Sequence, residues 1–151
     1  ELNAAPEINE LGPEPFDKSL TFQRFCGIIS HKRGKIKQIL MDQKVVAGIG
    51  NIYSDEILFE AKIHPFREAS QLSQGDIKRI YTAMKKILEK AIRLRGESFS
   101  DFRDTDGEKG YFDKARKVYR REGESCFRCG TIIKRIKMGG RSAHYCPTCQ
   151  L

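Results

Sequence analysis

The clearest alternation of apolar and polar positions lies between residues 73 and 96. Apolar side chains recur there at helical spacing, which predicts an amphipathic helix packed against a core. Ser73 and Asp76 have the spacing of a capping box at its start, and Gly96 is expected to end it. The other face is rich in lysine and arginine, which is typical of a solvated surface. The apolar positions are Ile77, Ile80, Tyr81, Met84, Ile87, Leu88, Ala91 and Leu94.

Shorter apolar patterns predict three further helices before residue 73. The first begins near Asp17 or Ser19, either of which can cap it. The second contains residues 39–41 and follows a basic stretch. The third runs from residue 52 to about residue 61, with Asn51 as its cap. No apolar run approaches the roughly 18 residues that span a bilayer, so no membrane partner is expected.

Composition divides the chain into four parts. Residues 1–16 contain three prolines and no basic residue, which indicates a linker or an arm from a preceding domain. Residues 17–96 form the helical domain, residues 97–112 a polar and flexible loop, and residues 113–151 a small hairpin module. The predicted fold class is therefore mainly α, with a helical domain followed by a short β-hairpin.

Two Cys-x2-Cys pairs separated by sixteen residues close the chain. This spacing predicts a tetrahedral four-thiolate site that binds one structural Zn²⁺, because four protein ligands leave no open position for catalysis. Two disulfides are the alternative, but Cys26 would then be left over and nothing indicates an oxidising compartment. His144 could replace one thiolate. The expected ligands are Cys126, Cys129, Cys146 and Cys149.

Charge is concentrated at the C-terminal end. The chain has a net charge of +8, and residues 109–151 carry eleven basic and three acidic side chains, whereas residues 1–108 carry 17 of each. Such a dense positive field predicts a polyanionic partner, nucleic acid before an anionic membrane surface. The simpler alternative is a basic surface kept for solubility. Reduced cysteines and this charge favour the cytoplasm, associated with the nucleoid.

A glycine-rich turn separates the second and third predicted helices. Gly48 and Gly50 let the backbone approach a ligand closely, and the helix that starts near Asn51 offers unpaired N–H groups. This arrangement can bind a phosphate oxygen. It is also typical of a tight packing turn, so the motif alone does not decide between the two.

The residues around this turn resemble a known family. The run from Leu40 to Pro65 is similar to the helix–two-turn–helix motif of formamidopyrimidine-DNA glycosylases, bacterial enzymes that remove 8-oxoguanine and ring-opened purines. The related endonuclease VIII-type glycosylases share both DNA-binding modules but match residues 106–112 less clearly. The resemblance covers residues 11–151 and continues through Ser100-Asp101-Phe102, Asp106-Gly107, Gly110-Tyr111-Phe112 and Val118-Tyr119 to Cys126-x2-Cys129-Gly-Thr and Gly140-Arg141-x3-Tyr145-Cys-Pro-x-Cys149.

The resemblance implies roles for individual residues. Asn51 and the neighbouring amides would hold a phosphate beside the lesion, and Arg141 would grip phosphates and donate a proton in the second elimination step. A guanidinium group suits the phosphate role better, because it holds its proton too tightly to be a good general acid. The loop at residues 97–112 would fold over the extruded base. The implied DNA-binding residues are Lys37, Gly48, Gly50, Asn51, Tyr119, Arg135 and Arg141.

The implied activity is base excision followed by strand cleavage through β,δ-elimination. In this family the nucleophile is the amine of an N-terminal proline on a preceding domain, whereas this chain opens with Glu1-Leu2. We therefore expect the C-terminal half of such an enzyme: a monomer that binds duplex DNA containing an oxidised purine or abasic site, without catalysis, and pairs with a missing N-terminal catalytic domain. Two alternatives are a free-standing zinc module that binds DNA or structured RNA, and a protein–protein adaptor.

Overall fold

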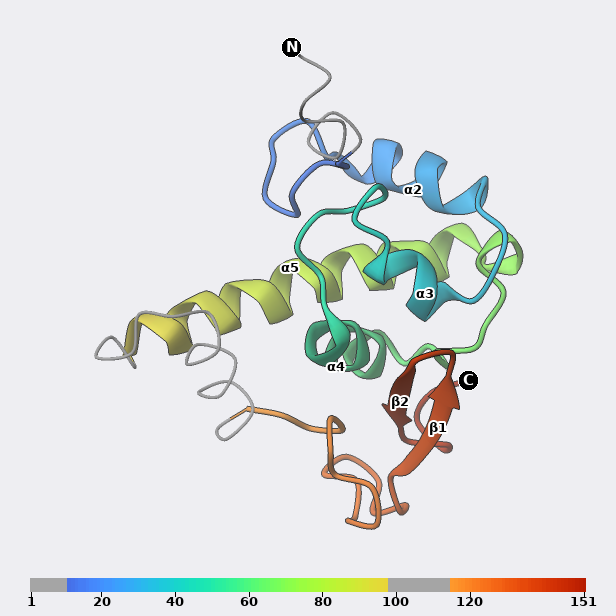
Figure 1. The fold of residues 1–151 in the computed structure, drawn as a ribbon, viewed down its shortest axis with the longest axis vertical. Helices are drawn as coiled ribbons and strands as arrows, with labels where there is room; N and C mark the ends of the chain where they lie inside the picture. The colour runs from blue at the N-terminus through green and yellow to red at the C-terminus, as the bar shows by residue number, and fades with distance from the viewer. Residues whose placement is uncertain (1–10, 98–114) are drawn as a thin grey trace.

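A computed structural model of the chain describes residues 11–97 and 115–151. It confirms a mainly helical fold with a two-stranded hairpin, and it leaves residues 1–10 and most of the predicted 97–112 loop outside the described residues. Helix α5 crosses the middle, α2 lies on one side of it and α4 on the other, and the hairpin packs below α4 (Figure 1). The elements are α2 (Phe22–Ser30), α3 (Ile36–Met41), α4 (Asn51–Ala61), the 3-10 helix η2 (Ala69–Gln71), α5 (Gln74–Glu97), β1 (Lys134–Met138) and β2 (Arg141–Tyr145).

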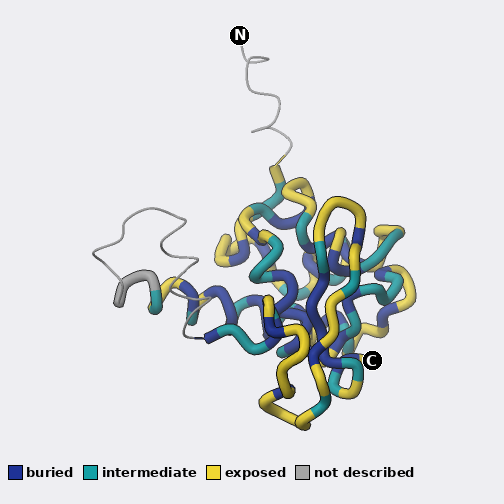
Figure 2. Tube along the Cα trace, turned by 60° about the horizontal axis from the view of Figure 1, so that its bottom comes forward, coloured by how far each residue is buried: buried dark blue, intermediate teal, exposed yellow. Residues whose placement is uncertain are grey.

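The apolar face predicted for α5 forms much of the core. Its side chains are buried or half-buried, with α5 packed against α2 and α4, and the buried parts of the chain run through the centre of the molecule (Figure 2). The capping box is confirmed: Asp76 N–H donates to Ser73 Oγ, and Ser73 N–H donates to an Asp76 carboxylate oxygen, both at 3.0 Å. The expected stop at Gly96 is wrong, because α5 continues to Glu97.

Two predicted helix starts differ from the structure. Thr21, rather than Asp17 or Ser19, caps α2, and its Oγ1 accepts from Arg24 N–H at 3.2 Å. Asp17 instead closes the preceding turn by accepting from Ser19 N–H. Asn51 is the first residue of α4, and the cap position belongs to Gly50, whose lack of a side chain leaves the first-turn N–H groups without a side-chain partner.

Residues 11–16 belong to the helical domain rather than to a free arm. Gly12 N–H donates to Gln43 O at 2.8 Å, and Ala47 N–H donates to Pro13 O at 3.0 Å. A Cβ at position 12 would lie 2.5 Å from the carbonyl oxygen of Val45, so only glycine permits this approach. The segment therefore braces the turn before α4.

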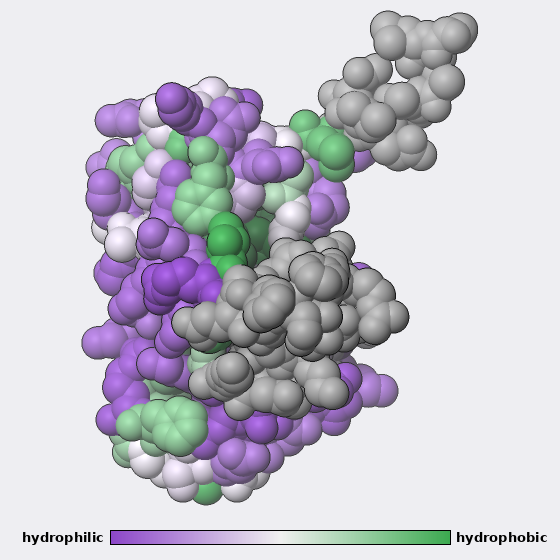
Figure 3. Space-filling model, turned by 90° about the vertical axis from the view of Figure 1, so that its left-hand side faces the viewer, coloured by the Kyte–Doolittle hydropathy of each residue, from purple (hydrophilic) through white to green (hydrophobic). Residues whose placement is uncertain are grey.

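The hairpin is antiparallel, with Lys134 opposite Tyr145 and Met138 opposite Arg141. Figure 3 shows another face of the molecule, which is mostly hydrophilic with a small apolar hollow beside the grey atoms. None of the helices within residues 11–97 and 115–151 combines the length and apolar composition that crossing a lipid bilayer requires.

Candidate nucleic-acid interface

One open cavity of about 700 Å³ brings the two modules together. The first residue of α4, Asn51, faces the tip of the hairpin across it, where Arg141 begins β2. These two residues are 90 positions apart in the sequence, so only the docking of the hairpin on α4 makes them neighbours. The lining residues are Asn51, Tyr119, Arg120, Glu122, Arg135, Gly140, Arg141, Ser142 and His144.

The α4 side of the cavity is built from the glycine-rich turn. Gly48 has a φ of +98°, a conformation that favours glycine, whereas Gly50 is extended with a φ of −104°. Gln43 fixes the turn, because its Oε1 accepts from Gly48 N–H at 2.7 Å. Asn51 Oδ1 is buried and has no hydrogen-bond partner among the described residues. The Asn51 amide and the first-turn N–H groups are thus the polar groups that this turn presents.

The hairpin side supplies two exposed guanidinium groups. Arg135 lies on β1 opposite His144, and its Nε donates to Ser142 Oγ on β2 at 3.0 Å. Arg141 follows the Gly139-Gly140 turn at the tip. Both side chains are exposed and line the cavity. Each of these planar guanidinium groups can donate two hydrogen bonds to phosphate oxygens.

Lys37 lies deeper than the resemblance suggested. Its side chain is 1% exposed, and its Nζ donates to Asp55 Oδ1 at 2.6 Å and to Ser54 Oγ at 2.9 Å. Burial lowers the pKa of Lys37, although the Asp55 carboxylate opposes that change. The ammonium group is committed to contacts inside the protein, so a direct contact between Lys37 and DNA stays a prediction.

Asp55 joins the helical domain to the hairpin. One carboxylate oxygen faces Lys37, and the other accepts from His144 N–H at 3.1 Å and contacts His144 Nδ1 at 2.8 Å. His144 therefore contacts α4 rather than the thiol cluster, so it is not a metal ligand. No sequence pattern predicts this contact, because Asp55 and His144 are 89 residues apart.

Glu56 holds the segment that leads into the hairpin module. Its carboxylate accepts from the backbone N–H groups of Lys117, Val118 and Tyr119, each at 2.9 Å. Burial raises the pKa of Glu56, and these three donors oppose the change by stabilising the charged form. Adjacent carboxylates on α4 thus fix two separate segments around the cavity. The Tyr119 side chain is placed in the cavity wall as a result.

The four cysteines form a zinc-finger site. Their sulfur atoms all lie within 4.8 Å of one another, with 3.5 Å between Cys129 and Cys146 and 3.9 Å between Cys126 and Cys149. A tetrahedral zinc ion with bonds of about 2.3 Å requires sulfur atoms about 3.8 Å apart, so the donor set fits. The cluster lies at the base of the hairpin, because Cys146 directly follows the end of β2 at Tyr145. Zinc bound to all four thiolates would stabilise the module that carries Arg141 and would leave no open position for catalysis.

The thiols differ in how readily they lose a proton. Hydrogen bonds with the side chain and the backbone of Thr131 lower the pKa of Cys129 to about 6. Burial raises the pKa of Cys149 to about 12, followed by the effects of the neighbouring thiols. A bound zinc ion would displace these protons, because thiolates are its ligands.

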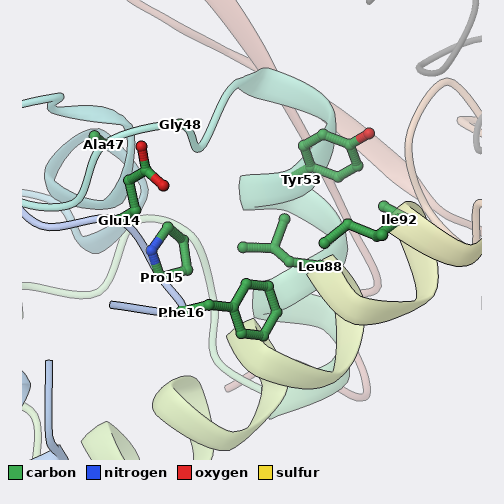
Figure 4. A pocket seen from close by; sticks show the side chains of 9 residues that line it. Glu14, Pro15, Phe16, Ala47, Gly48, Tyr53, Leu88 and Ile92 are labelled. Atoms are coloured by element: carbon green, nitrogen blue, oxygen red, sulfur yellow. The ribbon is translucent and has the colours of Figure 1, made fainter. Parts of the chain in front are cut away.

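A second cavity of about 320 Å³ lies on the other side of the turn (Figure 4). Phe16, Leu88 and Ile92 give it an apolar floor, and Tyr53 closes one side. Glu14 is the charged residue that lines it. An apolar cavity with one acidic residue does not suit a polyanion, so the cavity between α4 and the hairpin is the candidate nucleic-acid interface.

Five residues of that cavity were not among the predicted DNA-binding residues. They are Arg120, Glu122, Gly140, Ser142 and His144. Arg120 alone carried a signal, since it belongs to the basic cluster at residues 109–151. Of the predicted residues, the structure brings Asn51, Tyr119, Arg135 and Arg141 together.

Two sequence profiles match the chain and together cover most of it. The profile described as "Formamidopyrimidine-DNA glycosylase H2TH domain" matches residues 11–103. The profile described as "Zinc finger found in FPG and IleRS" matches residues 123–151. The boundary between the two matches falls where the helical domain gives way to the hairpin module.

Bacterial proteins align with nearly the whole chain. The formamidopyrimidine-DNA glycosylase of Prochlorococcus marinus is 47% identical over 148 residues, which are 98% of this chain and 51% of that relative. The enzyme of the same name from Bacillus cereus is 43% identical over 150 residues, which are 99% of this chain and 54% of that relative. The chain therefore spans about half the length of these relatives.

Solved structures have the same arrangement of modules. The MutM (Fpg) protein of Thermus thermophilus has a TM-score of 0.85 and 35% identity, covering 99% of this chain and 57% of its own. Lactococcus lactis Fpg bound non-covalently to DNA containing an AP site has a TM-score of 0.83 and 38% identity, covering 99% and 52%. A second Lactococcus complex, with DNA containing FAPY-dG, has a TM-score of 0.84 and 37% identity, covering 99% and 54%.

Proposed function

Because this chain belongs to the formamidopyrimidine-DNA glycosylase family, as its C-terminal H2TH and zinc-finger region, we propose that it is the DNA-gripping half of a base-excision glycosylase and AP lyase. Its ligand is duplex DNA that contains an oxidised purine or an abasic site. The observation that carries this proposal is the cavity in which Asn51, Arg135 and Arg141 face one another. Each of these groups can donate hydrogen bonds to phosphate oxygens.

The two sides of the cavity are proposed to bind different phosphates of the DNA backbone. The α4 end offers N–H groups and the positive end of a helix dipole to one phosphate. The hairpin offers Arg135 and Arg141 to phosphates nearby. Such contacts position a protein on the duplex without reading sequence. Between them the two sides can hold a strand while a nucleotide is extruded.

Residues 1–151 are proposed to bind DNA without excising bases. Family chemistry needs the free amine of an N-terminal proline, and the prolines of this sequence all lie inside the chain. Arg141 is proposed as a phosphate ligand in this bound state. Its further role as proton donor in strand cleavage belongs to the longer enzyme, in the bacterial cytoplasm, together with an N-terminal catalytic domain.

Fluorescence anisotropy with a labelled duplex tests the proposal. The duplex carries a stable abasic-site analogue, and an undamaged duplex and a duplex RNA of equal length serve as competitors. The logarithm of the association constant for DNA should fall linearly with the logarithm of salt concentration, with a slope of about −0.9 for each phosphate contacted. Affinity that does not respond to salt, or tighter binding to RNA, would contradict the proposal.

Arg141→Ala should weaken binding by about 1–3 kcal/mol, because a charge-assisted contact is lost. Arg24→Ala is the matched control: Arg24 is also an exposed arginine, but it lies on α2, and its guanidinium contacts Ser19. The control should bind like the wild type. Borohydride should trap no covalent adduct between this chain and abasic-site DNA, and a trapped band would reveal an amine nucleophile within it.

A further inference from the structure

Arg120 has a backbone conformation that its side chain disfavours. Its φ is +55°, and Lys62 is the other non-glycine residue with a positive φ in the described part of the chain. Arg120 is the third residue of a β-turn closed by a 3.0 Å hydrogen bond from Arg121 N–H to Val118 O. A positive φ at this turn position is normally left to glycine or asparagine, because a Cβ crowds the backbone there.

The residues on both sides of Arg120 hold the turn in place. Before it, the N–H groups of Val118 and Tyr119 donate to the buried Glu56 carboxylate. After it, the Arg121 guanidinium is buried and donates to the carbonyl oxygens of Lys117 and Ser125, each at 2.7 Å. The surrounding contacts therefore impose the disfavoured conformation on residue 120. A strained backbone conformation persists only where its surroundings hold it in this way.

The two adjacent arginines have opposite environments. Arg121 serves the interior, and its guanidinium also lies 3.8 Å from the centroid of the Phe127 ring. Arg120 is exposed and lines the cavity of the nucleic-acid interface, with its guanidinium 5.6 Å from the centroid of the Tyr119 ring. No hydrogen bond or ion pair of the Arg120 guanidinium is found within residues 11–97 and 115–151.

The charges of the cavity favour an anion beside Arg120. Arg135 and Arg141 line the same cavity, and Glu122 is the carboxylate that partly offsets them. Glu122 lies 3.7 Å from His144 Nε2. An exposed cation that remains among other cations gains most from a phosphate that can be shared or placed between them.

We propose that Arg120 is an additional phosphate-binding residue, which grips the backbone of the bound duplex next to the phosphates held by Arg135 and Arg141. The proposal rests on the proposed function, since it names a further contact of the same cavity. An arginine at this turn position makes the fold less stable than a glycine would, but it places a guanidinium group at the cavity. Replacing Arg120 with glycine should therefore stabilise the fold and weaken DNA binding.

Three variants separate the charge from the backbone. Arg120→Gly and Arg120→Ala both remove the guanidinium, and both should weaken binding to the abasic-analogue duplex about five- to tenfold at low salt. The salt dependence of both should fall by about one phosphate contact. Only Arg120→Gly relieves the backbone, so its zinc-loaded form should melt about 3 °C above Arg120→Ala. Arg120→Lys keeps the charge and should retain most of the wild-type affinity.

Lys62→Gly is the matched control. Lys62 is also an exposed cation in the left-handed region, with a φ of +64°, but it follows α4 at the end opposite Asn51 and does not line the cavity. It should gain thermal stability as Arg120→Gly does, with wild-type DNA affinity and salt dependence. This result, together with weaker binding by both neutral variants at position 120, would support the proposal.

Four outcomes would overturn it. Wild-type affinity in Arg120→Ala, or equal losses in Arg120→Ala and Lys62→Gly, would remove Arg120 from the interface while leaving the proposed function intact. Loss of binding in Arg120→Gly but not in Arg120→Ala would show that the backbone of the turn matters and the charge does not. A wild-type chain that fails to bind the duplex would overturn the proposed function, and this inference with it.

Discussion

Asp55 is the residue at which the helical domain and the hairpin meet. It is fully buried, with Lys37 on one carboxylate oxygen and His144 on the other. Asp55→Asn would leave the Lys37 ammonium buried without its counter-charge, and we expect it to lower the free energy of unfolding by about 3 kcal/mol. Chemical denaturation of the zinc-loaded protein measures this loss.

Two further variants test that explanation. Combining Asp55→Asn with Lys37→Met removes both buried charges and should recover most of the lost stability. Glu60→Gln breaks the more exposed ion pair with Lys86 and should change stability by less than about 1 kcal/mol. An equal loss in the single and double variants would show that Lys37 is not the group left uncompensated.

For the residues of the candidate site, the sequence predicted which chemical groups are present better than it predicted where each group lies. Asn51 and Arg141 were expected to face a common ligand, and the structure places them in one cavity. Lys37 was also expected at the DNA, but its partner Asp55 is 18 residues away on another helix. A lysine in a basic stretch gives no sign of burial, because the carboxylate that permits it is brought near only by tertiary packing.

Among the elements, α4 has the most contacts with the rest of the molecule. Its first turn forms one wall of the cavity, its middle carries Asp55 and Glu56, and the chain that leaves it packs on β2. Helix α5, by contrast, was predictable from the helical spacing of its apolar residues and from its capping box, because both are local features of the sequence. Local signals placed such elements well. They failed at Thr21, where several neighbouring residues can all cap and packing chooses one.

The exit of α4 provides a test of pH dependence. His64 Nδ1 accepts from Phe66 N–H at 3.0 Å, and its ring lies 4.5 Å from that of Tyr145 on β2. Burial, followed by the charge of Arg67, lowers the pKa of His64 below its ordinary value of 6.5. The folded state therefore binds fewer protons than the unfolded state, and stability is lost as pH falls from about 6.5 toward the folded pKa.

His64→Asn should remove that component, because an amide oxygen can accept from Phe66 N–H but does not titrate. We expect the wild type to lose more thermal stability between pH 7.5 and pH 5.5 than the variant, with zinc bound in both. The other histidines are common to the two proteins and cancel in the comparison. Parallel pH profiles would mean that the pKa of His64 does not differ between the folded and the unfolded state.

At the scale of the whole molecule, the segregation of charge predicted which part of the chain supplies the arginines of the cavity. The positive surplus after residue 108 includes both hairpin arginines of the cavity and the unpredicted Arg120. What charge could not predict is the orientation of the hairpin module. Three backbone N–H groups on Glu56 and a histidine on Asp55 fix it, and hydrogen bonds to main-chain groups have no signature in the sequence.

Removal of zinc should affect the hairpin module and the helical domain differently. Among the described residues, the hairpin module packs around a small cluster of five buried residues, whereas the helices share a larger core that does not include the cysteines. Phe59 of that cluster belongs to α4, and Cys126 and Cys146 are expected metal ligands; the other two members are Val118 and Ile133. A core this small does not fold without its metal. Chelation should therefore unfold residues 115–151, and it should leave helices α2 to α5 formed but less stable, because Asp55 and Glu56 lose partners.

Amide hydrogen exchange reports the two modules separately. After chelation, protection should disappear from β1 and β2 and persist in the middle of α5, and added zinc should restore the hairpin. DNA affinity should fall with the hairpin, because Arg135 and Arg141 then no longer face Asn51. Simultaneous loss of protection in α5 would mean that the helical core depends on the docked module, and unchanged protection in the hairpin would mean that metal is not what holds it.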